Sequence, residues 1–220
     1  MTQPRASSLS TAAQILRHAG VMPVVTIRDA ANAIRIAQAL IEGGLSAIEV
    51  TLRSEAALEA ISAIRREVPE INVGAGTVLN SDQLLAAQDA GAQFIVTPGT
   101  PPAMIDALSR SQVAVVPGAA TVSEMLALAA YGFDALKLFP AEPLGGVAML
   151  KSLRGPLPSI GFCPTGGIAE AQLPDYLAQP NVLCVGGSWL VRDEWVAAGD
   201  FTAITLAARR AAAAVQLARG

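Results

Sequence analysis

The chain has 220 residues, of which 52% are hydrophobic and only 15% charged, and its formal net charge is −3. Charged residues make up about 25% of a typical domain, so this composition excludes a disordered chain, and a pI near 5.2 without a basic run argues against a nucleic-acid partner. The mean hydropathy is +0.46, yet no stretch of about 18 unbroken apolar residues exists, so we expect no membrane span.

The N-terminal residues 1–10 are polar and lack the apolar core of a secretory signal. A helix is predicted next, over residues 9–19, and it carries His18, the single histidine of the chain. One imidazole cannot build a multi-histidine site, so we expect no metal and interpret His18 as a surface or packing residue. The two cysteines, Cys163 and Cys184, lie in apolar runs, which indicates buried free thiols in a reducing cytosol. A cytoplasmic protein is therefore expected.

Short apolar runs rich in β-branched residues alternate with segments of helical periodicity along the rest of the chain. Strands are predicted at residues 22–27, 47–51, 71–75, 94–97, 114–117, 135–139, 159–164 and 182–186, and a last helix at 201–219. Strands that alternate with helices imply a parallel α/β fold. Eight such units favour a single (β/α)8 TIM barrel over residues 1–220, with the first helix as an extra element. The alternative is a doubly wound sheet, but no GxGxxG motif follows the first strand.

Polar side chains that can begin a helix precede several of the helical segments. The predicted N-caps are Asp29, Ser54, Ser81 and Thr121. Thr121 and Glu124 also have the spacing of a capping box, in which each side chain binds the other residue's backbone N–H.

Lys137 interrupts the apolar run at 135–139. Strand alternation places Lys137 on the face opposite Leu136 and Leu138, so it points into the barrel if the leucines face the helices. Burial of an ammonium group is costly, which favours the neutral amine, and a neutral amine at a strand end can form a Schiff base with a ketone. The alternative is a lysine whose amine reaches solvent from an edge strand.

The predicted strand at 47–51 presents a second polar face, made of Glu49, Thr51 and the following Arg53. A carboxylate at Glu49 suits proton transfer, and the guanidinium of Arg53 suits a bidentate contact with a substrate carboxylate. The alternative is an internal ion pair of Glu49 with Arg53 or Lys137 that only satisfies buried charges.

Glycine pairs follow the last two predicted strands. Thr165, Gly166 and Gly167 come after the seventh strand, and Gly186, Gly187 and Ser188 come after the eighth. Barrels often bind phosphate at these two loops, where backbone N–H groups converge. Other candidate substrate contacts stand at the ends of the third, fourth and sixth strands and comprise Thr77, Pro98 and Phe139. Pro98 also suits a turn, and Phe139 also suits the core.

Five motifs resemble those of the 2-keto-3-deoxy-6-phosphogluconate aldolase family, which also includes 4-hydroxy-2-oxoglutarate aldolase activity. They are Glu-Val-Thr-Leu-Arg at 49–53, Gly-Ala-Gly-Thr-Val-Leu at 74–79, Lys-Leu-Phe-Pro-Ala-Glu at 137–142, Phe-Cys-Pro-Thr-Gly-Gly-Ile at 162–168 and Val-Gly-Gly-Ser-Trp-Leu-Val at 185–191. The resemblance covers nearly the whole chain. It implies a class I aldolase of the Entner–Doudoroff route, without cofactor, on a small barrel that is a homotrimer. The low charge also fits subunit burial.

The same resemblance implies roles for individual residues. Lys137 would be the Schiff-base lysine and Glu49 the general acid and base, with Arg53 and Thr77 at the pyruvyl carboxylate. Gly166, Gly167 and Ser188 would lie near the phosphate. The expected reaction cleaves 2-dehydro-3-deoxy-6-phosphogluconate into pyruvate and glyceraldehyde 3-phosphate.

Other functions stay open at this stage. The C4 epimer, 2-dehydro-3-deoxy-6-phosphogalactonate, is one alternative substrate, because one sequence cannot fix the orientation of a hydroxyl. Another is a non-aldolase sugar-phosphate enzyme that uses Lys137 only as a charge. A sugar-phosphate sensor without activity is a third, although a binding protein has little reason to bury a lysine beside a glutamate.

Overall fold

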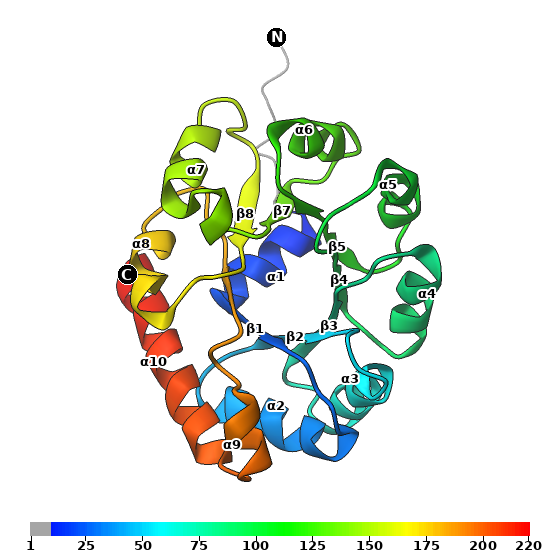
Figure 1. Cartoon of the computed structure of the whole chain (residues 1–220), viewed down its shortest axis with the longest axis vertical. Coiled ribbons are helices and arrows are strands. Elements are labelled where there is room, and N and C mark those ends of the chain that lie inside the picture. Colours follow the sequence, from blue (N-terminus) through cyan, green and yellow to red (C-terminus); the bar gives the residue numbers. More distant parts are fainter. Residues whose placement is uncertain (1–9) are drawn as a thin grey trace.

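The computed structural model describes residues 10–220, in which parallel strands alternate with helices (Figure 1). The strands are β1 (Val21–Val25), β2 (Ala47–Thr51), β3 (Asn72–Gly76), β4 (Phe94–Val96), β5 (Ala114–Val116), β6 (Gly118–Ala119), β7 (Ala135–Leu138), β8 (Gly161–Pro164) and β9 (Val185–Gly187). The helices are α1 (Thr11–Ala19), α2 (Ala33–Glu42), α3 (Ala57–Glu67), α4 (Ser81–Asp89), α5 (Pro102–Ser109), α6 (Val122–Ala130), α7 (Gly146–Leu153), α8 (Leu173–Leu177), α9 (Asp193–Ala197) and α10 (Phe201–Arg219). Short 3-10 helices occur at η1 (Ala30–Asn32), η2 (Glu142–Leu144) and η3 (Glu170–Gln172).

The strands form a curled parallel sheet in two parts, with all the helices after α1 around the outside (Figure 1). One part has the order β5-β4-β3-β2-β1-β9, and the other has the order β6-β7-β8. Isolated bridges pair Phe162 with Val182 and Thr165 with Gly186, where β8 approaches β9. The predicted parallel α/β fold is therefore confirmed.

Pro117 separates β5 from β6. The sequence predicts one strand that ends at residue 117, whereas the structure has a further short strand beyond the proline. Proline has no N–H to donate to a neighbouring strand, which accounts for the interruption of the ladder there. Its carbonyl still accepts a hydrogen bond from the backbone N–H of Lys137 at 2.9 Å.

Side chains of the strands point alternately inward and outward, as predicted. Ile48 and Val50 of β2 belong to the large apolar cluster that packs against the helices, whereas Ala47 belongs to a smaller inner cluster. On β7, Leu136 and Leu138 face outward in the same way. This alternation directs the intervening polar side chains of both strands into the interior.

Helix α1 lies across the middle of the ring of strands (Figure 1). Ser10 caps it, because its hydroxyl accepts a hydrogen bond from the N–H of Ala13 at 3.2 Å. Its buried residue Leu16 packs in the inner cluster with Phe94 and Val96. Residue 9, where the sequence predicts this helix to begin, lies outside the described residues.

The predicted capping box is confirmed: Thr121 and Glu124 bind each other's backbone N–H groups at the start of α6. Asp29 caps η1. The other two predicted caps are wrong. Asn80 rather than Ser81 caps α4, because its side chain reaches the N–H of Gln83. Ser54 donates instead to the carbonyl of Ile27, a long-range bond that local spacing does not reveal. Within residues 10–220, no helix has the length and apolar character needed to cross a membrane.

Candidate active site

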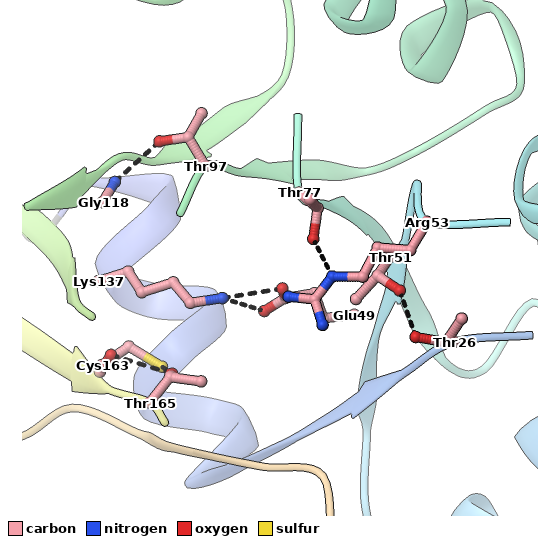
Figure 2. Close-up of polar contacts among 10 residues, drawn as sticks. All are labelled: Thr26, Glu49, Thr51, Arg53, Thr77, Thr97, Gly118, Lys137, Cys163 and Thr165. Carbon is pink, nitrogen blue, oxygen red and sulfur yellow. Dashed lines mark hydrogen bonds and ion pairs between the residues drawn. The ribbon is translucent and has the colours of Figure 1, made fainter. Parts of the chain in front are cut away.

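Glu49 on β2 and Lys137 on β7 meet inside the ring of strands (Figure 2). The Lys137 Nζ lies 2.9 Å from Glu49 Oε1 and 3.3 Å from Oε2. Their side chains are only 5% and 2% exposed. Two opposite charges are thus paired out of water, which is the arrangement in which a proton can pass between nitrogen and oxygen over one hydrogen bond.

Gly76 makes room for the carboxylate of this pair. A side chain at Gly76 on β3 would place its Cβ 2.2 Å from Glu49 Oε1, so only glycine fits beside the carboxylate. Lys137 is in register with Gly118 on β6 and with Cys163 on β8. The N–H of Gly118 donates to Thr97 Oγ1 at 2.9 Å, which ties β6 to the end of β4.

The two cysteines are free and buried, as predicted. A hydrogen bond with the Cys184 thiol lowers the pKa of Cys163, and the charge of Lys137 lowers it further. Burial raises the pKa of Cys184. Cys163 Sγ also lies 3.9 Å from Thr165 Oγ1, so the lysine is bordered on the β8 side by weakly polar groups.

Arg53 and Thr77 lie together at the mouth of the site (Figure 2). The exposed Arg53 donates from Nε to Thr77 Oγ1 at 3.1 Å. Thr77 has a positive φ of 59°, an uncommon conformation outside glycine that indicates a constrained position. The hydroxyl group of Thr51, the last residue of β2, lies 2.8 Å from the hydroxyl group of Thr26.

A cavity of about 200 Å³ opens over Lys137. Its walls are formed by Val24, Arg53, Lys137, Phe139, Thr165, Gly166, Gly167, Ile168, Gly186 and Ser188. Eight of these ten residues are singled out in the sequence analysis as site residues or as members of the two glycine pairs. Glu49 and Thr77 contact lining residues without lining the cavity themselves, whereas Pro98 and Gly187 lie outside its wall. The sequence reasoning missed Val24 and Ile168, whose apolar side chains gave no signal of a site.

Part of the cavity wall is made of backbone. Gly166 and Gly167 adopt φ values of 102° and 80°, a conformation that glycine reaches without strain. Within residues 10–220 the N–H groups of these two glycines donate to no other group. Ser188 is exposed beside them. Free N–H groups and a hydroxyl on one side, and an amine on the other, suit a ligand with a carbonyl and an anionic group.

Metal-ligating side chains do not gather anywhere in the part of the chain that the structure describes: no group of three or more His, Cys, Asp or Glu could hold an ion there. His18 is exposed on α1, as predicted.

The comparisons with known proteins agree with this geometry. A family model described as "KDPG and KHG aldolase" matches residues 12–207. A "2-dehydro-3-deoxy-phosphogluconate aldolase" of Pseudoalteromonas atlantica is 47% identical, over 88% of this chain and 90% of that protein. The "KHG/KDPG aldolase" of Escherichia coli K12 is 45% identical, over 94% and 98%. A crystal structure of the KDPG aldolase of Legionella pneumophila, with pyruvate captured as a covalent carbinolamine, superposes with a TM-score of 0.88 at 36% identity and covers 91% of this chain and 97% of that one.

Substitution of Gly76 by alanine tests the tight packing around Glu49. The new Cβ would displace the carboxylate, so we expect Gly76→Ala to lower the free energy of unfolding by about 1–3 kcal/mol, the usual cost of overpacking. Gly99→Ala is the matched control, because nothing lies within 4 Å of a Cβ there. Urea denaturation measures both, and equal midpoints for the two variants would contradict the packing argument.

Proposed function

The chain belongs to the KDPG and KHG aldolase family, and we propose from this premise that Lys137 is its Schiff-base lysine and Glu49 its general acid and base. The protein is a class I aldolase, a lyase that cleaves 2-dehydro-3-deoxy-6-phosphogluconate into pyruvate and glyceraldehyde 3-phosphate. The observation that carries the residue assignment is the buried amine of Lys137, hydrogen-bonded to a carboxylate at the wall of a cavity.

The first half of the reaction activates the amine. Glu49 takes a proton from the ammonium of Lys137 over their 2.9 Å hydrogen bond, which leaves a neutral amine and a carboxylic acid. The amine attacks the C2 ketone and gives a carbinolamine. Glu49 then returns its proton to the departing hydroxyl, water leaves, and an iminium forms between C2 and the lysine nitrogen.

The second half breaks the carbon–carbon bond. Glu49, again a carboxylate, removes the proton of the C4 hydroxyl, directly or through one water. The C3–C4 electrons move to the iminium and give an enamine, and glyceraldehyde 3-phosphate leaves. Glu49 protonates C3 of the enamine, and addition of water to the resulting iminium releases pyruvate and restores the amine. The iminium is the electron sink throughout.

The remaining site residues divide between the two ends of the substrate. Arg53, with Thr77 beside it, binds the pyruvyl carboxylate, for which a guanidinium offers paired donors. Gly166, Gly167 and Ser188 bind the phosphate, supported by the free glycine N–H groups at the cavity. Phe139 and Thr165 line the space between, since the Phe139 ring centre is 5.5 Å from Lys137 Nζ. Pro98, in the turn after β4, and Gly187, the last residue of β9, complete the predicted set.

The name of the Escherichia coli relative supports a second activity, cleavage of 4-hydroxy-2-oxoglutarate to pyruvate and glyoxylate by the same steps. The galactonate epimer and a non-aldolase barrel enzyme are not favoured, because relatives at 45–47% identity are named for the gluconate substrate. A role in the Entner–Doudoroff route in the cytoplasm follows from the same substrate.

We also propose that the strands form a complete barrel and that the chain assembles as a trimer. We place β5 and β6 as one strand interrupted at Pro117, so that eight strands close into a single (β/α)8 domain through the bridge between Thr165 and Gly186. Helix α1 then closes the end of the barrel opposite the active site. Exposed Leu85 on α4 and Leu126 on α6, 58% and 53% accessible, support burial of this side in a homotrimer.

Substitutions at Lys137 and Glu49 separate their roles. Lys137→Ala and Lys137→Arg should abolish both cleavage and borohydride trapping with pyruvate, because a guanidinium stays protonated and cannot attack a ketone. Glu49→Gln should still form some adduct, but cleavage should fall by about 10²–10⁴-fold. Exchange of the pyruvate methyl protons with deuterated solvent, followed by NMR, should fall with it.

The control for these variants is peptide mapping of the trapped adduct. The label should lie on Lys137 and not on Lys151, which is exposed on α7 and is the only other lysine of the chain. A label on Lys151, or undiminished exchange in Glu49→Gln, would overturn the assignments.

Loss of the Ser188 hydroxyl should affect phosphorylated substrates selectively. A hydrogen bond to a charged group contributes about 1.5–3 kcal/mol, so we expect Ser188→Ala to lower kcat/KM roughly ten- to a hundredfold for the phosphorylated substrate. The measurement compares that substrate with 4-hydroxy-2-oxoglutarate, which has no phosphate. Equal losses on both would mean that Ser188 has a structural role.

The trimer is tested by light scattering, which should give three times the chain mass of 22.5 kDa. Leu126→Glu places a charge on the proposed interface and should reduce the measured mass. Leu217→Glu, at an 86% exposed position of α10, is the matched control and should leave the mass unchanged. A monomeric mass at micromolar concentration would refute the trimer.

A further inference from the structure

Glu142 and Tyr176 form a hydrogen-bonded pair beside the cavity that no step of the mechanism uses. Glu142 is the first residue of η2, just after β7, and Tyr176 lies on α8. The Tyr176 hydroxyl donates to Glu142 Oε1, and the residue is 1% exposed. Burial, together with the neighbouring carboxylate, raises the pKa of the Tyr176 phenol, so it keeps its proton as a donor.

Glu142 also contacts the turn that forms part of the proposed phosphate wall. This turn, the glycine turn, consists of Thr165, Gly166 and Gly167. Its backbone N–H donates to the carbonyl of Gly166 at 3.0 Å, and the preceding N–H of Ala141 donates to the carbonyl of Thr165 at 2.8 Å. The carbonyls of Thr165 and Gly166 are therefore held by the backbone of Ala141 and Glu142.

The side chain of Glu142 packs directly on the glycine turn as well. A Cβ at Gly167 would lie 2.8 Å from Glu142 Cβ, so the two residues are in close contact. On the other side, a Cβ at Gly146 would lie 2.7 Å from both Glu142 Oε1 and Tyr176 Oη. Gly146 thus leaves room for the carboxylate to reach the phenol. The bond to the phenol in turn fixes the Glu142 rotamer, whose Cγ would lie 3.2 Å from a Cβ at Gly167.

We propose that Glu142 and Tyr176 are positioning residues that hold the glycine turn with its N–H groups directed into the cavity, where they receive the anionic end of the substrate. This inference rests on the proposed function for the identity of that anion. The carbonyls of the turn are taken by Glu142 and Ala141, and the opposite faces of the same peptide units carry the free N–H groups of Gly166 and Gly167. A wall that is already in place costs no ordering when the ligand binds.

The Glu142–Tyr176 pair should affect binding of the phosphorylated substrate and not the Schiff-base chemistry. Lys137 and Glu49 are held by β7 and β2, whereas Glu142 and Tyr176 contact the glycine turn and each other. Loss of the pair should therefore raise KM for the phosphorylated substrate and leave the formation of the enamine from pyruvate intact.

The test compares Tyr176→Phe, Glu142→Ala and Glu142→Gln. We expect Tyr176→Phe and Glu142→Ala to raise KM for 2-dehydro-3-deoxy-6-phosphogluconate about tenfold, with kcat nearly unchanged. Glu142→Gln keeps an oxygen that accepts from the phenol, so it should restore KM towards the wild-type value. Deuterium exchange into pyruvate and KM for 4-hydroxy-2-oxoglutarate should stay within about twofold of wild type in all three.

Tyr131→Phe is the matched control, because Tyr131 is the only other tyrosine of the chain and is 53% exposed. It should behave as wild type in every assay. Equal losses on both substrates and on pyruvate exchange would make the pair merely structural, and an unchanged KM in Tyr176→Phe and Glu142→Ala would refute it as a positioning device. If Tyr176→Phe fails to fold, the two Glu142 variants decide.

The proposed function can fail separately. A wild-type protein that neither cleaves the phosphorylated substrate nor traps pyruvate would overturn the aldolase assignment. The pair is then judged by calorimetric binding of glycerol 3-phosphate: weaker binding by Tyr176→Phe than by Tyr131→Phe supports it, and equal binding or no binding to the wild type overturns it.

Discussion

The ion pair between Lys137 and Glu49 is the constraint on which the rest of the interior depends. Each charge taken out of water costs several kcal/mol, and only the partner and good geometry offset that cost. On β3, Gly76 leaves the space that the Glu49 carboxylate occupies, because a Cβ there would lie 2.2 Å from Glu49 Oε1. Inside the ring, Leu16 of α1 and Phe94 belong to an apolar cluster, so the pair stands between a dry core and a cavity.

The strands of this site hold the proposed reacting groups, whereas its loops form the proposed phosphate wall. The proposed reacting groups Lys137 and Glu49 lie on β7 and β2, where hydrogen-bonded neighbours on both sides fix the backbone. The proposed phosphate wall stands on the loops after β8 and β9, which need support from elsewhere in the chain. Glu142 supplies part of that support, because its backbone N–H donates to the carbonyl of Gly166 and its side chain accepts from Tyr176 of α8. A change in the loops can therefore alter which substrates bind while the Schiff-base chemistry stays in place.

The inward direction of Glu49 and Lys137 is predictable from the alternation of side chains along a strand. Each of the two lies between apolar residues that face outward, and a side-chain period of two places it on the opposite face. Other features depend on contacts that local spacing does not encode. Asn80 displaces Ser81 as a cap by one position, and Glu142 and Tyr176 meet across 34 residues. The sequence predicts that a strand ends at Pro117, although the chain resumes pairing beyond it at β6.

The proton transfers of the proposed mechanism explain why a single carboxylate contacts Lys137. Among the residues that line the cavity and their hydrogen-bond partners within residues 10–220, Glu49 is the one acid that touches Lys137. Each proposed transfer leaves Glu49 in the state that the next step needs: acid after it accepts the lysine proton, base after water leaves, acid again after the C4 hydroxyl is deprotonated. A second carboxylate nearby would hold a competing proton and raise the cost of charging the first. In the proposed mechanism, one buried glutamate beside Gly76 therefore serves every proton transfer of the cycle.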